Sequence, residues 1–332
     1  MKPIKASGCK GLVSQDHYSR HDLDFDVPQA TKGHIKLTEQ DQCTMKDLNY
    51  QLKQLCRNNR DGSYATQALR SRMLDQMADQ LHELGFRKMQ AKSLKPKHVV
   101  ALTRLWERQG LSTGTRKNRM STLRWWAGKV NKKHVVARDN EHYGLARRQY
   151  VSNASRVTTL NNEQIESIRD PNTRLSLKLQ QAFGLRREEA IKFQPSCAIK
   201  DDHLQLKSSW CKGGRARTIP IANDAQRELL KEVQAFAKGG SLIPPDLKYV
   251  QQLRRYEGQT RRAGLRKLHG LRHGYAQRRF QEITGFACPA QGGPVSRDLT
   301  PDQRALNEKA RAVISAELGH ARENITAVYL GR

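Results

Sequence analysis

The sequence predicts a mainly α-helical protein with a small β-hairpin, divided into an all-helical domain and a mixed α+β domain. Apolar residues recur at helical spacing through residues 44–133. Helical stretches continue through residues 160–332, but short runs of alternating apolar and polar residues interrupt them between 197 and 221. A chain of 332 residues is long enough for two domains of ordinary size.

Four helices are expected in the first domain. They are centred on Leu48–Leu55, Ala68–Leu84, Val99–Trp106 and Thr115–Val130. Residues 1–43 show little periodicity and are expected to form an N-terminal extension without an assigned role. Residues 134–159 are basic and polar, which predicts a linker between the two domains.

The last helix of the first domain combines an apolar stripe with many basic residues. Met120, Leu123, Ala127 and Val130 fall on one apolar stripe, and basic residues occupy the flanks. Basic side chains in such a position can contact phosphates, although a solvated charged face is the alternative. The candidates, which include two lysines just beyond the helix, are Arg116, Lys117, Arg119, Arg124, Lys129, Lys132 and Lys133.

The second domain contains a predicted break between two helices. The apolar residues that lead to Phe183 predict a helix, and Gly184 suits its end. A new helix is expected from Arg187, with Glu188 and Glu189 in its first turn. Arg186 then lies at the junction.

Three short strands are expected next, at residues 197–200, 203–207 and 217–221. The segment between the last two contains Lys212, Gly213 and Gly214, which places Lys212 at a β-hairpin. Residues 281–308 are rich in glycine and proline and are expected to be an inserted loop, either a surface excursion or a contact site for DNA or a partner.

The composition points to a polyanionic partner. Lys and Arg number 60 and Asp and Glu 32, a net charge of +28, and both halves of the chain carry the excess. Double-stranded DNA is the leading candidate, with solubility charge as the alternative. The six cysteines form no Cys-x-x-Cys pair, so neither a zinc site nor a disulfide framework is expected. Without a signal peptide or an apolar run of membrane-spanning length, the expected location is the cytoplasm.

The chemistry-bearing residues suit phosphodiester transfer. Arginine forks bind phosphate oxygens, which makes Arg186 and Arg272 candidate clamps. Tyr329 is the candidate nucleophile and Lys212 the candidate general acid. His269 and His320 are candidates for orienting the phosphate or exchanging protons beside it.

These residues resemble the ordered signature of the tyrosine recombinases, the phage-integrase family. The resemblance rests on Gly184-Leu185-Arg186-x-x-Glu189, the Lys212 hairpin, His269-x-x-Arg272-His273, Leu318-Gly319-His320 and Tyr329. It implies a helical core-binding domain at 44–133 and a mixed α+β catalytic domain at 160–332. Glu189 and His273 would support the catalytic groups without touching the phosphate.

The resemblance also implies a reaction. Tyr329 would attack a scissile phosphate, leave a 3′-phosphotyrosyl link and a free 5′-hydroxyl, and exchange strands through a four-way junction without metal or other cofactor. A homotetramer on paired DNA sites would integrate or excise a mobile element in the bacterial nucleoid, with DNA-bending or directionality proteins as possible accessories. The alternatives are a catalytically silent DNA-binding regulator or architectural protein and a type IB topoisomerase-like enzyme.

One expectation concerns the end of the sequence. Only three residues follow Tyr329. We therefore expect no tail helix for exchange between subunits, so that contacts between protomers would come from elsewhere, with residues 281–308 as the first candidate.

Overall fold

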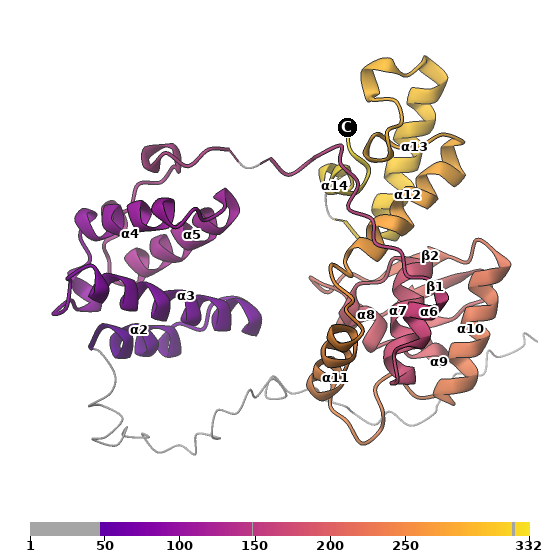
Figure 1. The fold of residues 1–332 in the computed structure, drawn as a ribbon, viewed down its shortest axis with the longest axis horizontal. Coiled ribbons are helices and arrows are strands. Elements are labelled where there is room, and N and C mark those ends of the chain that lie inside the picture. The colour runs from indigo at the N-terminus through magenta and orange to yellow at the C-terminus, as the bar shows by residue number, and fades with distance from the viewer. Residues whose placement is uncertain (1–46, 148, 321–322) are drawn as a thin grey trace, which may run out of the picture. The chain divides into compact units, whose positions relative to one another are not determined.

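The computed structural model describes residues 47–147, 149–320 and 323–332, and the chain divides into two units between residues 148 and 149. Figure 1 shows the mainly helical character of both units and a small hairpin in the second. This confirms the predicted fold class. The expected extension at 1–43 lies outside the described residues. None of the helices in the described ranges is long and apolar enough to cross a membrane.

The first unit contains the four expected helices. They are α2 (Asp47–Asn58), α3 (Tyr64–Glu83), α4 (Pro96–Arg108) and α5 (Thr113–Lys129), with a 3₁₀ turn η1 (Ala91–Ser93) before α4. Ser63 and Ser112 cap α3 and α5 by accepting a hydrogen bond from a backbone amide of the first turn. Trp106 and Trp126 lie fully buried in the core between these helices.

The first unit extends further along the chain than the predicted boundary at residue 133. Two 3₁₀ turns, η2 (Lys133–Val135) and η3 (Glu141–Tyr143), follow α5. Val135, Val136 and Leu145 are buried in the same core as the four helices. Residues 134–147 therefore belong to this unit, because their few apolar side chains complete its core, and the connector is shorter than expected.

The second unit is built around α7 and α12. Its first elements are α6 (Asn162–Glu166), α7 (Pro171–Phe183), α8 (Arg187–Ile191) and α9 (Pro195–Ala198). The hairpin of β1 (His203–Leu206) and β2 (Arg217–Pro220) follows, with η4 (Ser208–Trp210) in its connection. Then come α10 (Asp224–Ala237), α11 (Tyr249–Arg262), α12 (Gly270–Thr284), α13 (Pro301–Glu317) and α14 (Ala327–Leu330).

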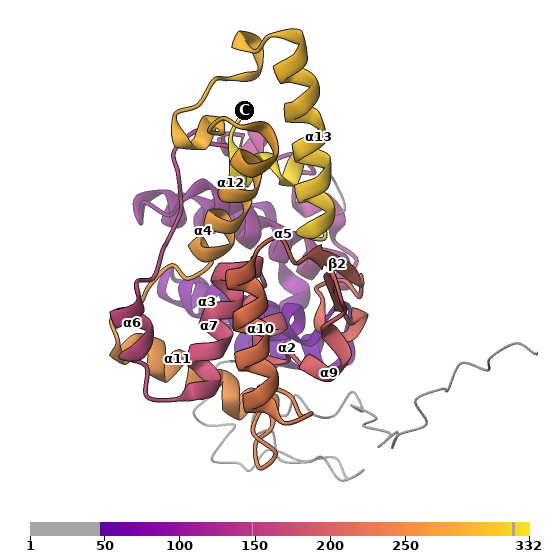
Figure 2. The ribbon, with the colours of Figure 1, turned by 90° about the vertical axis from the view of Figure 1, so that its right-hand side faces the viewer.

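The packing of the second unit brings distant segments together. Helices α12 and α13 run side by side, as Figure 2 shows, and β2 and α14 also pack against this pair. The main core joins Phe183 of α7, Phe280 of α12 and Ile314 of α13 with the hairpin residues Leu204 and Ile219. A smaller core lies beneath α11.

The predicted hairpin is confirmed, but the strand predicted at 197–200 is wrong. Strands β1 and β2 pair antiparallel, with His203 opposite Pro220 and Leu206 opposite Arg217. Residues 195–198 instead form the short helix α9, because Pro195 occupies its first turn, where its fixed φ and missing amide are tolerated. Ile199 makes a single bridge to Leu204.

The predicted insertion at 281–308 overlaps two helices at its ends. Helix α12 continues to Thr284 and α13 starts at Pro301, so the irregular part covers 285–300 and contains η5 (Pro289–Gln291) and η6 (Ser296–Asp298). Cys288, Ala290 and Leu299 are buried, and η5 packs against α14. This segment is therefore part of the fold, because its apolar side chains support the last helix.

Candidate active site

The junction between α7 and α8 places Arg186 as predicted. Gly184 ends α7 in the left-handed conformation, with φ +61°. A Cβ atom there would lie 2.6 Å from a ring carbon of Tyr275, so the position requires glycine for two reasons. Arg186 is the N-cap residue of α8, and its backbone amide donates to the Glu189 carboxylate at 2.6 Å.

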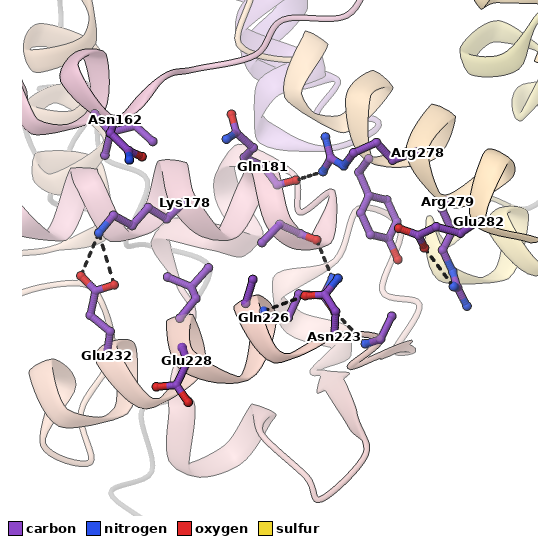
Figure 3. A pocket seen from close by; sticks show the side chains of 16 residues that line it. Asn162, Lys178, Gln181, Asn223, Gln226, Glu228, Glu232, Arg278, Arg279 and Glu282 are labelled. Atoms are coloured by element: carbon purple, nitrogen blue, oxygen red, sulfur yellow. Dashed lines mark hydrogen bonds and ion pairs between the residues drawn. The ribbon is translucent and has the colours of Figure 1, made fainter. Parts of the chain in front are cut away.

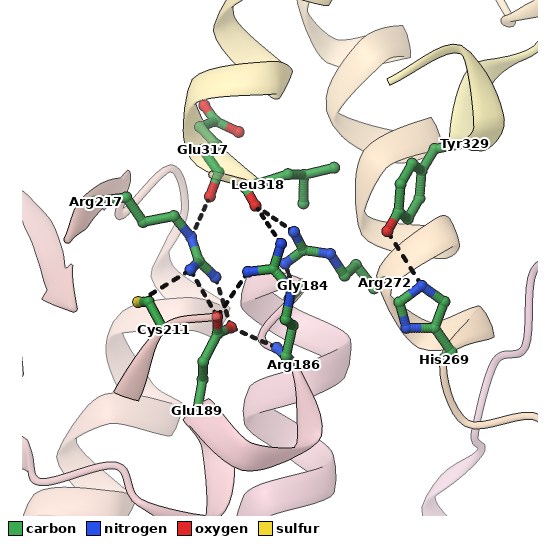
Figure 4. Close-up of polar contacts among 10 residues, drawn as sticks. All are labelled: Gly184, Arg186, Glu189, Cys211, Arg217, His269, Arg272, Glu317, Leu318 and Tyr329. Carbon is green, nitrogen blue, oxygen red and sulfur yellow. Dashed lines mark hydrogen bonds and ion pairs between the residues drawn. The ribbon is translucent and has the colours of Figure 1, made fainter. Parts of the chain in front are cut away.

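Glu189 organises the site from a fully buried position. Arg217 on β2 donates two hydrogen bonds to its carboxylate, at 2.6 and 2.7 Å, and Arg186 donates a third at 2.8 Å. Burial alone would raise the pKa of Glu189, but these hydrogen bonds and the positive charges of Arg217 and Arg186 outweigh it and lower the pKa to about 2. Glu189 is a carboxylate at neutral pH, and it orients both arginines (Figure 4).

Arg217 is a site residue that the sequence analysis missed, since it was treated only as part of a strand. Its Nε donates to the carbonyl of Glu317 at 2.8 Å, and its side chain is buried. One feature of the sequence could have identified it. Buried and exposed residues alternate along β2, and Arg217 falls on the same buried face as Ile219. An arginine at an inward position needs a buried acceptor.

Arg272 lies deeper in the site than Arg186. It is only 1% exposed and donates to the carbonyls of Gly184, at 2.6 Å, and Leu318. Arg186 donates to the same Leu318 carbonyl at 3.3 Å, so two cations converge there (Figure 4). Burial and the nearby charge of Arg186 lower the pKa of Arg272 to about 10, and the guanidinium stays charged at neutral pH.

Tyr329 is surrounded by histidines. Its hydroxyl lies 3.1 Å from Nε2 of His269 (Figure 4). The ring centroids of His273 and His320 lie 4.4 and 5.1 Å from that of Tyr329, with interplanar angles of 32° and 28°. The nucleophile candidate is itself 6% exposed. Its ring is therefore fixed by packing as well as by its hydroxyl.

The three imidazoles are neutral at pH 7. Burial lowers the pKa of each, to about 4 for His273 and about 3 for His320. Neighbouring groups lower these pKa values further. His269 lowers the pKa of His273, Arg272 lowers that of His320, and Arg272 and Arg186 lower that of His269. A neutral imidazole that carries its proton on Nδ1 accepts the phenol proton at Nε2. His269 is exposed overall, so it is also within reach of a ligand.

Two buried nitrogen atoms beside Tyr329 lack hydrogen-bond partners among the residues that the structure describes. They are Nε of Arg272 and Nε2 of His320. Nδ1 of His320 lies 3.0 Å from the hydroxyl oxygen of Thr326, which accounts for the other side of the ring. Buried polar nitrogens without hydrogen-bond partners are rare, and here both lie beside the ring of the candidate nucleophile.

Lys212 is the one predicted catalytic residue that makes no contact with this cluster in the described part of the chain. It is exposed on the segment that joins β1 and β2, and it makes no hydrogen bond or ion pair with any residue in the described ranges. The other predictions converge in one place. These are Arg186, His269, Arg272, His320 and Tyr329, together with Glu189 and His273.

Several residues of α5 that were predicted to contact DNA have partners within the first unit instead. Arg119 is buried, donates to Gln76 at 2.9 Å and lies over the ring of Trp106, because α5 turns it toward α3 and α4. It is therefore a packing residue. Arg124 donates to the carbonyls of Ala137 and Asp139 and thereby fixes the segment after η2.

The other basic residues of this region differ in whether their side chains have partners within the first unit. Lys129 pairs with Asp61 at 3.1 Å, Arg116 lies 3.4 Å from Glu107, and Lys132 donates to the carbonyl of Leu94. The remaining two, Lys117 and Lys133, make no hydrogen bond or ion pair within the described ranges. Lys133 is the more exposed of the two.

Two cavities of the second unit differ in the residues that line them. One of about 570 Å³ lies between α7, α10 and α12, and opposite charges such as Lys178 and Glu232 pair along its wall (Figure 3). It contains none of the candidate catalytic residues. The other, of about 780 Å³, adjoins His269 and is lined by four basic residues. They are Arg187, Arg261, Arg266 and Lys267.

No group of three potential metal ligands is present among the histidine, cysteine and acidic residues that the structure describes. The four cysteines in those ranges, Cys56, Cys197, Cys211 and Cys288, are free thiols.

Two family models match the chain. The model described as the N-terminal part of phage integrase matches residues 45–133, and the model described as integrase matches residues 147–278. Together they match the four helices of the first unit and the second unit as far as residue 278, so they end before His320 and Tyr329. Among curated proteins, no sequence matches this chain.

Solved structures share the fold. A lambda integrase dimer bound to a COC′ core site is 18% identical, with a TM-score of 0.58 over 90% of this chain and 83% of that one. The XerH site-specific recombinase bound to difH in a pre-cleavage complex is 17% identical, with a TM-score of 0.51 over 91% and 87%. With the two family models, the order of the motifs and this shared fold, the chain belongs to the tyrosine recombinase, or phage integrase, family.

Proposed function

We propose that this protein is a site-specific recombinase that cleaves and rejoins double-stranded DNA through a 3′-phosphotyrosyl intermediate. One observation carries the proposal. The hydroxyl of Tyr329 lies 3.1 Å from Nε2 of His269, and its ring lies beside Arg272 and His320, each of which has a buried nitrogen without a hydrogen-bond partner among the described residues. A phosphodiester supplies those acceptors, and its phosphorus then lies within reach of the phenol oxygen.

The first step is an in-line displacement. Oη of Tyr329 attacks the scissile phosphorus while its proton passes to Nε2 of His269. The new bond joins phosphorus to the tyrosine oxygen, and the bond from phosphorus to the 5′-oxygen breaks with its electron pair leaving on that oxygen. Arg186 and Arg272 offset the negative charge that develops on the non-bridging oxygens.

The departing 5′-oxygen needs a proton, and we assign this role to Lys212. Gly213 and Gly214 follow it with φ of +77° and +68°, so the turn that carries Lys212 depends on glycine. In the proposed complex this exposed segment closes on the DNA. Rejoining reverses the step with the 5′-hydroxyl of a partner strand, and the phosphotyrosyl bond conserves the energy of the broken linkage, so no nucleotide cofactor is required.

Each unit contributes cations of its own to the proposed DNA binding. In the second unit, exposed arginines on and after α11 adjoin the basic cavity beside His269, and in the first unit Lys117 and Lys133 remain available. Each phosphate that such a cation neutralises contributes about −0.9 to the slope of log K against log salt. Arg261→Ala should therefore reduce that slope by about 1.

The family match with phage integrase favours a role in integrating or excising a mobile element. Such a role requires two DNA sites held together, and we propose a homotetramer on the paired sites, with accessory DNA-bending or directionality proteins. Light scattering of the complex with two synaptic duplexes tests the stoichiometry.

The decisive experiment uses nicked duplexes drawn from DNA that flanks the encoding gene. Loss of the short fragment beside the nick prevents rejoining, so the wild-type protein should accumulate a covalent adduct. Tyr329→Phe should abolish the adduct. Tyr256→Phe is the matched control, since Tyr256 is also buried and its hydroxyl also has a side-chain partner, Gln180.

Other outcomes identify the alternatives. DNA binding without adduct on any of these duplexes would indicate a catalytically silent regulator or architectural protein. Relaxation of supercoiled plasmid that lacks a recombination site would indicate a type IB topoisomerase-like enzyme. In either case the recombinase proposal fails.

A further inference from the structure

Helix α14, which carries Tyr329, has only four residues and cannot hold its own position. Its backbone is held instead by Gln277 of α12, which is 1% exposed. The side-chain amide of Gln277 donates to the carbonyl of Tyr329 at 2.9 Å. Its oxygen accepts from the hydroxyl of Ser155 at 3.2 Å. A buried amide with both of its ends bonded fixes one orientation.

The residues after Tyr329 are held in the same way. The amide of Arg332 donates to the side chain of Asn153 at 2.9 Å, and Asn153 donates back to the carbonyl of Arg332 at 3.1 Å. Arg311 of α13 donates to the carbonyl of Gly331 at 3.0 Å. Gly331 has φ +79°, and a Cβ atom there would lie 2.7 Å from Asn153 and 2.8 Å from the amide of Ala290. The backbone on both sides of this glycine is therefore closely fitted.

The segment that contains Asn153 and Ser155 also contacts the other half of the site. Thr158 donates to the carbonyl of Lys267 at 3.2 Å. A Cβ atom on Gly270, the residue after His269, would lie 2.3 Å from the Thr158 hydroxyl and 2.6 Å from the carbonyl of Arg156. Residues 153–158 therefore lie between the backbone of the nucleophile and the start of the helix that carries His269 and Arg272.

We propose that Gln277 and Asn153 are positioning residues for Tyr329, and this rests on the function proposed above. They hold the backbone of α14 within the same chain, so that the phenol stays within hydrogen-bond distance of His269. Neither side chain contacts the phenol oxygen. The segment that holds the nucleophile is also the segment through which the chain enters the second unit.

The test compares Gln277→Met with Gln180→Met in the full-length protein. Both glutamines are buried and each makes two side-chain hydrogen bonds, but Gln180 bonds to Ser176 and Tyr256, away from α14. Methionine keeps the shape and removes the hydrogen bonds. The measurements are the single-turnover rate of adduct formation at saturating nicked DNA, the Kd for DNA and Tm.

Gln277→Met should lower the rate of adduct formation about tenfold or more, because small displacements of a reacting group are costly. Its Kd should stay within about twofold, since uniform binding is not affected. Gln180→Met should lower Tm to a similar extent with little loss of rate. Equal loss of rate in both variants, or no loss in Gln277→Met, overturns the proposal.

Amide hydrogen exchange of the protein without DNA provides an independent measurement. Residues 327–332 should exchange faster in Gln277→Met and in Asn153→Ala than in the wild type, and at the wild-type rate in Gln180→Met. Unchanged exchange in the first two variants refutes the positioning role. If the wild type forms no adduct, the proposed function fails and exchange alone decides this inference. If Gln277→Met does not fold, Asn153→Ala, at an exposed position, takes its place in both measurements.

Discussion

Replacing Arg217 by methionine should destabilise the second unit strongly. The side chain is buried, and it donates two hydrogen bonds to the fully buried Glu189 and one to the carbonyl of Glu317. Methionine has a similar length but no charge. The variant therefore leaves the Glu189 carboxylate buried with Arg186 as its remaining cation, at 2.8 Å.

Two routes give a similar magnitude. Removing one partner of a buried ion pair typically costs about 3–5 kcal/mol, and the remaining contact with Arg186 favours the lower end. The pKa of Glu189 is lowered from 4.5 to about 2, and at about 1.4 kcal/mol per pKa unit this corresponds to about 3 kcal/mol in favour of the folded carboxylate. We expect Arg217→Met to lower the free energy of unfolding by about 3 kcal/mol at pH 7.

A double-mutant cycle with Glu189→Gln measures the interaction. Urea unfolding of the full chain, followed by pulsed hydrogen exchange in residues 171–193 and 301–320, reports the second unit. The double variant should be more stable than the sum of the single effects predicts, by about 2 kcal/mol or more. Arg187→Met is the control, because its pair with Glu257 is exposed and should be worth less than about 1 kcal/mol.

The contribution of Glu189 to the free energy of unfolding should also depend on pH in a definite direction. Because the folded pKa of Glu189 is depressed, its contribution is complete above pH 4.5 and is lost as the pH falls toward 2. In Arg217→Met this acid-induced loss should shrink, since the carboxylate no longer gains from its main partner. Additive single effects, or a cost no larger than that of the control, would refute the account of Glu189 as the organising charge.

Three further predictions follow from burial and backbone geometry. The pKa values of His273 and His320 are lowered to about 4 and about 3, so the folded protein binds fewer protons than the unfolded chain below about pH 6.5. The free energy of unfolding should therefore fall by up to about 1.4 kcal/mol per pH unit for each histidine as the pH drops below that value. Tm measured from pH 7 to 5 should show this fall, and His273→Gln should make Tm depend less on pH. Gly319→Ala should cost about 1–3 kcal/mol, because φ is +61° and the Cβ would lie 2.8 Å from a buried arginine carbon, whereas Gly285→Ala, with φ +79° and open space, should cost less in urea unfolding. Arg119→Leu should destabilise the first unit without changing the salt dependence of DNA binding, and a reduced salt slope would contradict its assignment to packing.

The sequence predicted the helices of the first unit and the break at Gly184 because their signals are local. Helical periodicity and an αL glycine need no knowledge of the rest of the chain. The same holds for the β1–β2 hairpin. Residues 134–147 were assigned to the linker, because three scattered apolar residues, Val135, Val136 and Leu145, gave no periodic signal although they pack in the core of the first unit.

The ordered motifs predicted most of the site but not what holds it together. Whether Arg119 is buried depends on which side of α5 faces α3. The sequence of α5 does not determine that side, because arginine and apolar residues are mixed along it. Arg217 and Gln277 were missed because their partners, Glu189 and Tyr329, lie 28 and 52 residues away in sequence. Contacts of this kind depend on tertiary packing, which local pattern does not encode.

The candidate site has more hydrogen-bond donors than its own acceptors satisfy, and this bears on how DNA would enter it. Arg186 and Arg272 both donate to the single carbonyl of Leu318, while Nε of Arg272 and Nε2 of His320 have no partner in the described part of the chain. A phosphodiester brings acceptors and no donors. In the proposed complex its oxygens approach the unpaired nitrogens and leave the carbonyl bonds that fix Arg272 in place, so that binding offsets part of the cost of desolvating these groups. By this argument the arrangement around Tyr329 is selective for an anion that accepts hydrogen bonds from several directions at once.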